Sequence, residues 1–435
     1  MPISPQARLL DRLEALKGQF KSDAGREAAA LLRQAGRTQW ADAAQLIHCH
    51  EIVSFLRAYP QNKHVLQLAD RVLATLGAQV KRLRKTGSDA FEDPATSGIT
   101  QTGLSTFFSH PFAHSLALRY GNAVSIDWEA YEHPERLGRV LARLIPEAYE
   151  DWAIAPHPDW RRWYEKADGS VAWLTQNVQP EVFDLLELPI RLELGDSVAS
   201  RSRGRIERKR IFFHDRDRPL LTRKDVSLSR ELASKAIRVQ RLSKVPAAKL
   251  IGKIVDASAV RYRELYGFEY PDLANLFHAD LGRGMDLYFF GVPAKAKLPS
   301  REYVCGMYCK NGVPIGYVEC MWTRRKMEIG FNLYYTFRQG ETAWLYVRLM
   351  KLFRQQFGVT QFSIDPYQLG HENAEAIESG AFWFYYKLGF RPEHRKIAAL
   401  AAQEMQKIGA EAGYRTRPTI LQKLAGGAVV LTIEK

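Results

Sequence analysis

The sequence predicts an α+β protein, in which a mainly α-helical N-terminal region precedes a mixed β-sheet domain flanked by helices. Apolar residues recur at helical spacing from residue 5 to about residue 86. Strand-like runs gather between residues 285 and 335, and a strand, turn, helix, strand and helix follow between residues 327 and 392. A length of 435 residues suggests two or three domains.

We expect three regions along the chain. Residues 1–90 read as a helical domain, and an aperiodic stretch from Lys85 to Gly98 is the first expected linker. Residues 91–235 form a mainly helical middle region that contains a basic loop, 201–210. Residues 236–435 form the sheet domain and a C-terminal extension.

The composition favours a polyanionic partner. The formal net charge is +14 and the isoelectric point is about 9.5. Nucleic acid, an anionic membrane surface and a phosphorylated ligand such as coenzyme A all fit this balance, and so does an arginine-rich solvated surface without a partner. No apolar run reaches the roughly 18–20 residues that span a bilayer, and four cysteines fit no disulfide framework. We therefore expect a cytoplasmic protein without a membrane span; its oligomeric state stays open.

Two short stretches are candidates for other sites. Six of the ten residues from Arg201 to Arg210 are basic, so this run is a candidate contact for nucleic acid or for the 3′-phosphate of coenzyme A. The alternative is a solvated loop. His48, Cys49, His50 and Glu51 resemble a metal cluster, but neighbours on a helix point about 100° apart, so we expect a packed helix face and no metal.

The C-terminal domain begins with a predicted strand at Ile237–Leu242 and two predicted helices, from about Ala247 to Tyr266 and from Pro271 to Ala279. Four strand-like runs follow. Asn311 and Gly312 between the second and third run predict a tight hairpin turn.

The connection from Arg338 to Ala343 is the main candidate site. It joins a strand to a predicted helix from Trp344 to Phe357. A helix N-terminus offers free backbone N–H groups and a partial positive charge, which suit a pyrophosphate. Gly340 permits close approach of a ligand, and Arg338 adds a full charge. An ordinary strand-to-helix connection uses the same residue types.

These elements resemble the GNAT superfamily of acyl-CoA N-acyltransferases over roughly residues 236–395. The family's turn motif falls on Arg338-Gln339-Gly340-Glu341-Thr342-Ala343, with Glu341 in place of the central glycine. The family's helix motif falls on Glu378, Ala381, Tyr385, Gly389 and Phe390, with Glu378 in place of asparagine. The whole chain is also similar to a family of long uncharacterised bacterial proteins that share Phe-Asn-Leu-Tyr-Tyr-Thr-Phe and Ser-Gly-Ala-Phe-Trp-Phe-Tyr, which implies no particular reaction.

The resemblance implies a role for each matched position. An acyl-CoA, acetyl-CoA or longer, would be the co-substrate, with its pyrophosphate on the backbone amides of Gln339, Gly340, Glu341, Thr342 and Ala343. The strand edge at Leu333, Tyr334 and Tyr335 would pair with the pantetheine amides. Tyr385 would protonate the leaving thiolate, since a tyrosine keeps its proton at neutral pH.

The general base and the orientation of Glu341 stay open. Candidate bases are Glu328, ranked first for its place on a central strand, and Glu319, His371 and Glu372. Glu341 could point into the turn and oppose a phosphate, point outward, or pair with Arg338.

His371, Glu372 and Asn373 form a polar cluster that fits either a substrate-side group or helix capping by Asn373.

Three functions compete. The first is an acyl-CoA-dependent N-acyltransferase that transfers an acyl group to an amine on a small molecule or protein. The second is a catalytically silent GNAT-like domain that senses a ligand or supports assembly. The third is a basic protein associated with RNA or aminoacyl-tRNA, in which Arg201–Arg210 carries the function.

Overall fold

A computed structural model describes residues 4–21, 23–85, 89–154 and 159–433. The chain divides into two compact units, and both contain residues from distant parts of the sequence. Unit 1 comprises residues 1–218, 243–271 and 311–314, and unit 2 comprises residues 219–242, 272–310 and 315–435. Residues 243–271, which we assigned to the C-terminal domain, thus group with unit 1. The expected linker at Lys85–Gly98 lies partly outside the described residues.

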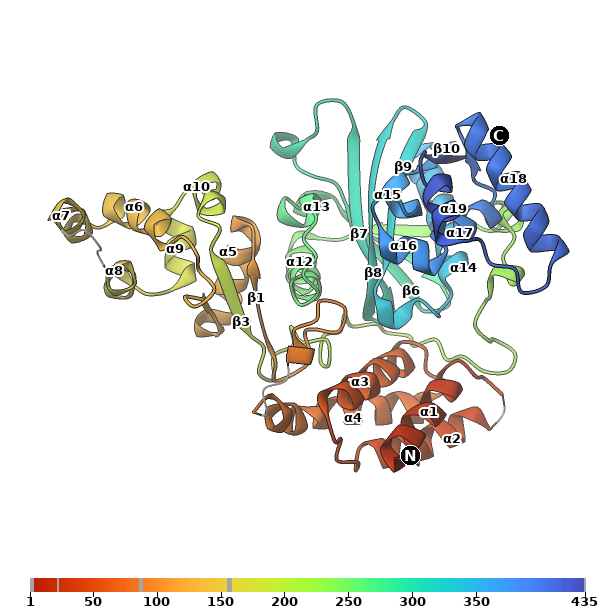
Figure 1. The fold of residues 1–435 in the computed structure, drawn as a ribbon, viewed down its shortest axis with the longest axis horizontal. Helices are drawn as coiled ribbons and strands as arrows, with labels where there is room; N and C mark the ends of the chain where they lie inside the picture. Colours follow the sequence, from red (N-terminus) through yellow and green to blue (C-terminus); the bar gives the residue numbers. More distant parts are fainter. Residues whose placement is uncertain (1–3, 22, 86–88, 155–158, 434–435) are drawn as a thin grey trace. The chain divides into compact units, whose positions relative to one another are not determined.

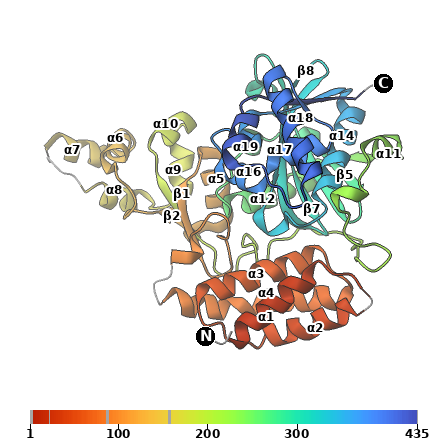
Figure 2. The same ribbon diagram turned by 45° about the vertical axis from the view of Figure 1, so that its right-hand side comes forward.

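Unit 1 begins with a helical bundle, as the apolar spacing predicts (Figure 1 and Figure 2). Its helices are α1 (Pro5–Lys17), α2 (Ala24–Ala35), α3 (Ala43–Ala58) and α4 (Lys63–Arg84). The side chains of Ser4, Asp42 and Asn62 cap α1, α3 and α4 by accepting a backbone N–H, which explains where these helices start. One continuous apolar core, including Leu13, Leu32 and Leu73, holds them together.

The rest of unit 1 combines short helices with a small antiparallel sheet of order β1-β3-β2. Its remaining elements are β1 (Gly103–Phe107), α5 (His110–Tyr120), β2 (Val124–Ile126), α6 (Pro134–Leu144), α7 (Pro146–Ile154), α8 (Trp160–Ala167), α9 (Val171–Asn177), α10 (Pro180–Leu185), β3 (Pro189–Glu193), α12 (Lys244–Ala259) and α13 (Tyr266–Glu269). The helix predicted from Ala247 to Tyr266 is therefore real but ends at Ala259.

Unit 2 is built on a sheet that contains nine strands among the described residues, in the order β11-β12-β10-β9-β8-β7-β6-β5-β4. The strands are β4 (Arg238–Arg241), β5 (Leu276–Gly282), β6 (Met285–Phe290), β7 (Glu302–Lys310), β8 (Val313–Thr323), β9 (Lys326–Leu333), β10 (Gln361–Ile364), β11 (Arg391–Pro392) and β12 (Val429–Thr432). The helices are α11 (Leu228–Ala233), α14 (Thr342–Phe357), α15 (Pro366–Leu369), α16 (Ala374–Ser379), α17 (Ala381–Lys387), α18 (Arg395–Ala410) and α19 (Pro418–Leu424). Helices α14 to α19 lie together on one side of the central strands (Figure 1).

The predicted α+β class is confirmed, and so is most of the strand sequence. Asn311 and Gly312 both adopt positive φ, 51° and 81°, which is the backbone of the predicted two-residue hairpin turn between β7 and β8. The helix predicted from Pro271 to Ala279 is wrong. Its second half belongs to strand β5, which pairs on both sides, with β4 and β6, because sheet pairing outweighs weak local preference.

The C-terminal extension completes the sheet. Strand β12 lies between β10 and β11 and pairs antiparallel with both, so residues near the end of the chain enter the sheet. The helix predicted before Phe390 is divided by Gly380, whose φ of 66° ends α16 and starts α17. The second helix stops before Gly389, whose φ is 109°, and the phenyl ring of Phe390 is buried.

Candidate functional site

The candidate site lies in unit 2, where the parallel strands β9 and β10 separate. Among the described residues, they pair only at Lys326, Met327 and Glu328, opposite Gln361, Phe362 and Ser363. Strand β10 then ends, and Asp365 caps α15, whereas β9 continues to Leu333 with β8 as its partner. We call the side of Ile329–Leu333 that faces away from β8 the open edge. Such an edge presents backbone N–H and C=O groups that can pair with an extended chain.

The side chain of Gln368 on α15 occupies part of the open edge. Its Oε1 accepts a hydrogen bond from the Phe331 N–H at 3.1 Å, and its Nε2 donates to the Ile329 carbonyl oxygen at 3.0 Å. The two bonds lie on either side of Gly330, as do the bonds made by a residue on a neighbouring parallel strand. One side-chain amide therefore takes the place of the strand residue that β10 does not supply.

Tyr385 on α17 lies behind this amide. Its hydroxyl donates to Oε1 of Gln368 at 3.4 Å, and its ring packs edge-on against Tyr346, Phe384 and Phe390. Burial raises the pKa of Tyr385 well above its ordinary value, because the phenolate would lose its hydration. Tyr385 is therefore protonated at neutral pH, and its raised pKa makes it a weaker acid than an exposed tyrosine.

Glu341 at the N-terminus of α14 lies in none of the three predicted positions. Its carboxylate points into the interior of unit 2, where it pairs with Arg283 at 2.6 Å and with Lys310 at 3.0 Å. Glu341 is 1% exposed and Lys310 is fully buried. The three side chains together carry a net charge of +1, because two cations surround one carboxylate. Glu341 is therefore held away from the turn by charges that no local pattern places beside it.

Most of the remaining residues of the turn are exposed or half-buried. Arg338 and Gln339 are exposed, Gly340 and Thr342 are half-buried, and Ala343 is buried. Arg338 pairs with Glu375 at 2.6 Å, so the expectation that it could neutralise Glu341 is wrong. Helix α14 starts directly after this turn, so its first amides face the same side as these residues.

The segment predicted to pair with pantetheine, Leu333–Tyr335, runs from the end of the open edge to this turn. Leu333 ends β9, and its carbonyl oxygen accepts a 3.4 Å bond from Nε of Arg338. Tyr334 is buried, and its N–H donates to Ile315 on β8, away from the open edge. Tyr335 is 62% exposed. Of the predicted pantetheine edge, Leu333–Tyr335, only Leu333 thus belongs to the open edge, and the rest of the open edge lies earlier on β9.

The two candidate bases on neighbouring strands, Glu319 and Glu328, stand at different register positions relative to the open edge. Glu319 stands opposite Gly330 in the β8–β9 register, and its carboxylate accepts a 2.6 Å bond from the Tyr303 hydroxyl. A β-carbon at Gly330 would lie 3.6 Å from Nε2 of Gln368 and 3.7 Å from the β-carbon of Glu319. Glu328 stands opposite Met321, and its carboxylate lies 3.9 Å from Arg301. Glu319 is thus in register with a residue of the open edge, whereas Glu328 lies in the part of β9 that pairs with β10.

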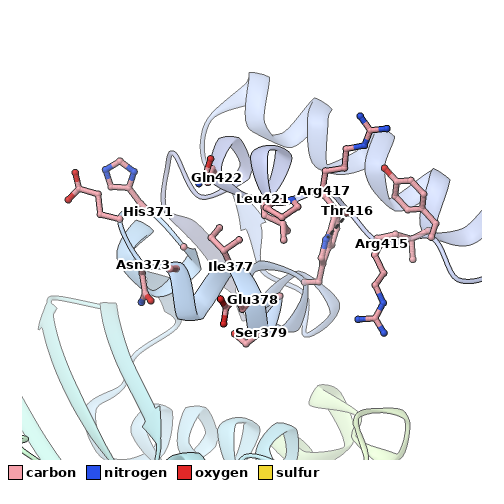
Figure 3. A pocket seen from close by; sticks show the side chains of 18 of the residues that line it. His371, Asn373, Ile377, Glu378, Ser379, Arg415, Thr416, Arg417, Leu421 and Gln422 are labelled. Atoms are coloured by element: carbon pink, nitrogen blue, oxygen red, sulfur yellow. Dashed lines mark hydrogen bonds between the residues drawn. The ribbon is translucent and has the colours of Figure 1, made fainter. Parts of the chain in front are cut away.

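His371 and Glu372 line a separate cavity of about 1190 Å³ within unit 2, between α16, α17 and α19 (Figure 3). Ile377 and Leu421 point into it from opposite sides, and His371 lies at one end (Figure 3). Tyr385 is not among the described residues that line this cavity.

His371 and Glu372 are both exposed. Asn373, the next residue, caps α16 by accepting the Ala376 N–H at 3.1 Å. Helix capping is thus confirmed for Asn373, and the structure does not bring His371 or Glu372 to the open edge.

The basic run in unit 1 is not a uniformly solvated loop. Arg201 is buried and donates to both carboxylate oxygens of Glu51 at 2.7 Å, while Ser202 and Ile206 are also buried. The expectation of a solvated loop is therefore wrong for this part of the run, because α3 supplies the carboxylate that pairs with the first arginine. Exposed basic side chains remain at Arg203, Lys209 and Arg210.

In the His48–Glu51 segment, Cys49, His50 and Glu51 are buried, as expected of a packed helix face, whereas His48 is exposed. His50 is fully buried between Glu51 at 3.1 Å and Ser202 at 3.0 Å, and burial lowers its pKa to about 4. Within the described ranges, no group of three His, Cys, Asp or Glu side chains is arranged to hold a metal ion. No helix in the described part of the chain is long and apolar enough to cross a membrane.

Sequence patterns identified the turn and Tyr385 but missed Gln368, Lys310 and Arg283. Gln368 follows Asp365-Pro366-Tyr367 in a short connection, where nothing in the local pattern distinguishes it from a surface glutamine. Comparisons with protein-family models, with curated proteins and with solved structures give no match to this chain. What the site can do therefore follows from its geometry.

Proposed function

We propose that the protein is an acyl-CoA-dependent N-acyltransferase, with unit 2 as its catalytic part. The observation that carries this proposal is the separation of β9 from β10, which leaves an open edge leading directly into the N-terminus of α14. An extended ligand with secondary amides pairs with a strand edge, and its phosphates suit a helix N-terminus. An acyl-CoA combines both features in one molecule.

The charges below the turn support this assignment. In the cluster of Glu341, Arg283 and Lys310, the Glu341 carboxylate is paired with two cations, so it opposes a phosphate less than an unpaired carboxylate would. The substitution of the central glycine by Glu341 is thus compatible with an anion site.

The proposed reaction is transfer of the acyl group from sulfur to nitrogen. A carboxylate, for which we favour Glu319 over Glu328, accepts a proton from the acceptor ammonium. The free amine attacks the thioester carbonyl, an N–C bond forms, and the C–S bond breaks. Tyr385 donates its proton to the leaving thiolate, and the second proton that the acceptor nitrogen loses as the amide forms restores the phenol. The acceptor class that this chemistry requires is a primary amine on a small molecule or a protein.

Calorimetric titration of the full-length protein with acetyl-CoA, a longer acyl-CoA and free coenzyme A tests the proposal. We expect binding of all three, and release of free thiol when an amine acceptor is added. Failure of a folded sample to bind any of them at millimolar concentration would refute the proposal. Binding without turnover across a panel of amines would favour a silent ligand-sensing domain. A steep salt dependence of RNA binding would instead favour the nucleic-acid alternative.

A further inference from the structure

Gln368 completes the hydrogen-bond pattern of β9 at the point where β10 leaves the sheet. If β10 continued in the register of Ser363 opposite Glu328, its next bonding position would face Gly330. The chain instead enters α15 at Pro366, and the Gln368 amide makes the two bonds of that position, to Phe331 and Ile329. A carboxamide has the same donor and acceptor as a peptide group, so the mimicry is chemically complete.

The same oxygen of Gln368 also accepts the Tyr385 hydroxyl at 3.4 Å. The open edge and the proposed acid are therefore linked through one side chain. Gln368 is half-buried and stands on a one-turn helix whose next residues, Leu369 and Gly370, are buried. A change of its side-chain rotamer can release both contacts without unfolding the sheet.

We propose that Gln368 is a positioning residue that occupies the open edge in the free protein and is displaced by the acyl donor. The inference rests on the proposed function and specifies how its site is controlled. An extended ligand amide that pairs with Ile329 and Phe331 uses the two groups that Gln368 uses. Ligand binding therefore moves Gln368 away, and the Tyr385 hydroxyl is released at the moment when the thioester arrives. The affinity for the acyl donor is lowered by the cost of breaking the bonds of Gln368 to Ile329 and Phe331. Until the donor binds, the Tyr385 hydroxyl stays bonded to Gln368 and away from solvent.

Replacement of Gln368 by methionine tests the displacement, because methionine keeps the length of the side chain and removes its two hydrogen bonds to β9 and the one from Tyr385. Breaking two neutral hydrogen bonds lowers affinity by about 5- to 150-fold, so Gln368→Met should bind free coenzyme A and acyl-CoA about tenfold more tightly than the unaltered protein. Gln361→Ala is the matched control, since Gln361 is a half-buried glutamine on β10 whose amide contacts Thr432. Its affinity should be unchanged.

Hydrogen exchange measured by mass spectrometry adds a readout that does not depend on turnover. Without ligand, a peptide that covers residues 327–337 should exchange faster in Gln368→Met than in the unaltered protein, because the Phe331 N–H loses its acceptor. Saturating coenzyme A should restore protection in the variant. Gln361→Ala should show the unaltered pattern.

The outcomes separate the two proposals. Tighter binding by Gln368→Met, including binding that the unaltered protein lacks, supports displacement. Equal or weaker binding by a folded Gln368→Met overturns the displacement proposal and leaves the acyltransferase proposal intact. If neither protein binds any coenzyme A derivative at millimolar concentration, the proposed function itself is refuted. Unchanged exchange of the 327–337 peptide in Gln368→Met would show that the Gln368 bonds do not protect the edge, which also overturns the displacement proposal.

Discussion

Replacement of Glu341 by alanine should strongly destabilise unit 2. The substitution removes the carboxylate between Arg283 and Lys310 and leaves the fully buried Lys310 ammonium without its 3.0 Å partner. Breaking a buried ion pair by removing one member costs about 3–5 kcal/mol, because the remaining charge loses its counter-ion inside the protein. We expect a loss of unfolding free energy in this range.

The matched control is Glu375→Ala. Glu375 also accepts an arginine at 2.6 Å, but that pair lies on the surface, with side-chain exposures of 37% for Arg338 and 61% for Glu375. An exposed pair is worth about 0.2–1 kcal/mol, since water replaces the partner. Both variants therefore remove a 2.6 Å arginine–carboxylate pair, and Glu341→Ala removes a buried one together with the 3.0 Å Lys310 pair. A double variant, Lys310→Met with Glu341→Leu, should be more stable than Glu341→Ala, because it removes both buried charges.

Native-state hydrogen exchange of the amides in α14 measures these differences within unit 2, and the amides of α3 in unit 1 serve as an internal reference. The reasoning is refuted if Glu341→Ala destabilises α14 by less than about 1 kcal/mol, or by no more than Glu375→Ala does. A double variant less stable than Glu341→Ala would likewise contradict an electrostatic cause.

Three further predictions concern catalysis and pH. Tyr385→Phe should bind acyl-CoA normally and lower kcat by about 10²- to 10⁴-fold; an unchanged kcat at saturating acyl-CoA removes Tyr385 as the acid. Glu319→Gln should lower kcat/KM far more than Glu328→Gln, and the reverse order would return the role of base to Glu328. The third prediction concerns His50, whose burial lowers its pKa to about 4, so its contribution to stability is present above pH 6.5 and is lost as the pH falls towards 4. Between pH 7.5 and pH 5 the loss should be about 2 kcal/mol, visible in the urea midpoint of unit 1 and reduced in His50→Asn.

Local patterns were sufficient for most of the secondary structure. The helical spacing of Leu13, Leu32 and Leu73 is set by which face of each helix is apolar, and that face becomes the bundle core. The Asn311-Gly312 turn follows from the φ preferences of two residues. Strand β5 was missed because its pairing partners, β4 and β6, decide its conformation.

The features of the candidate site also differ in whether they depend on nearby or on distant residues. The turn before α14 and the Tyr385 helix are recognisable from the sequence, because each depends on residues close together in the chain. The direction of the Glu341 side chain is not, because Arg283 and Lys310 reach it from 58 and 31 positions away. The bonds of Gln368 to Phe331 and Ile329 span 37 and 39 positions and depend on where β10 ends.

The amino-acid sequence was thus enough to establish the α+β class, the run of strands from β6 to β9 and the chemical types available in the turn. The raised pKa of Tyr385, the pairing of Glu341 and the occupancy of the open edge emerged from the three-dimensional packing. The physical reason is that periodicity and turn preference act over a few residues, whereas burial and charge pairing depend on neighbours that the folded sheet brings together.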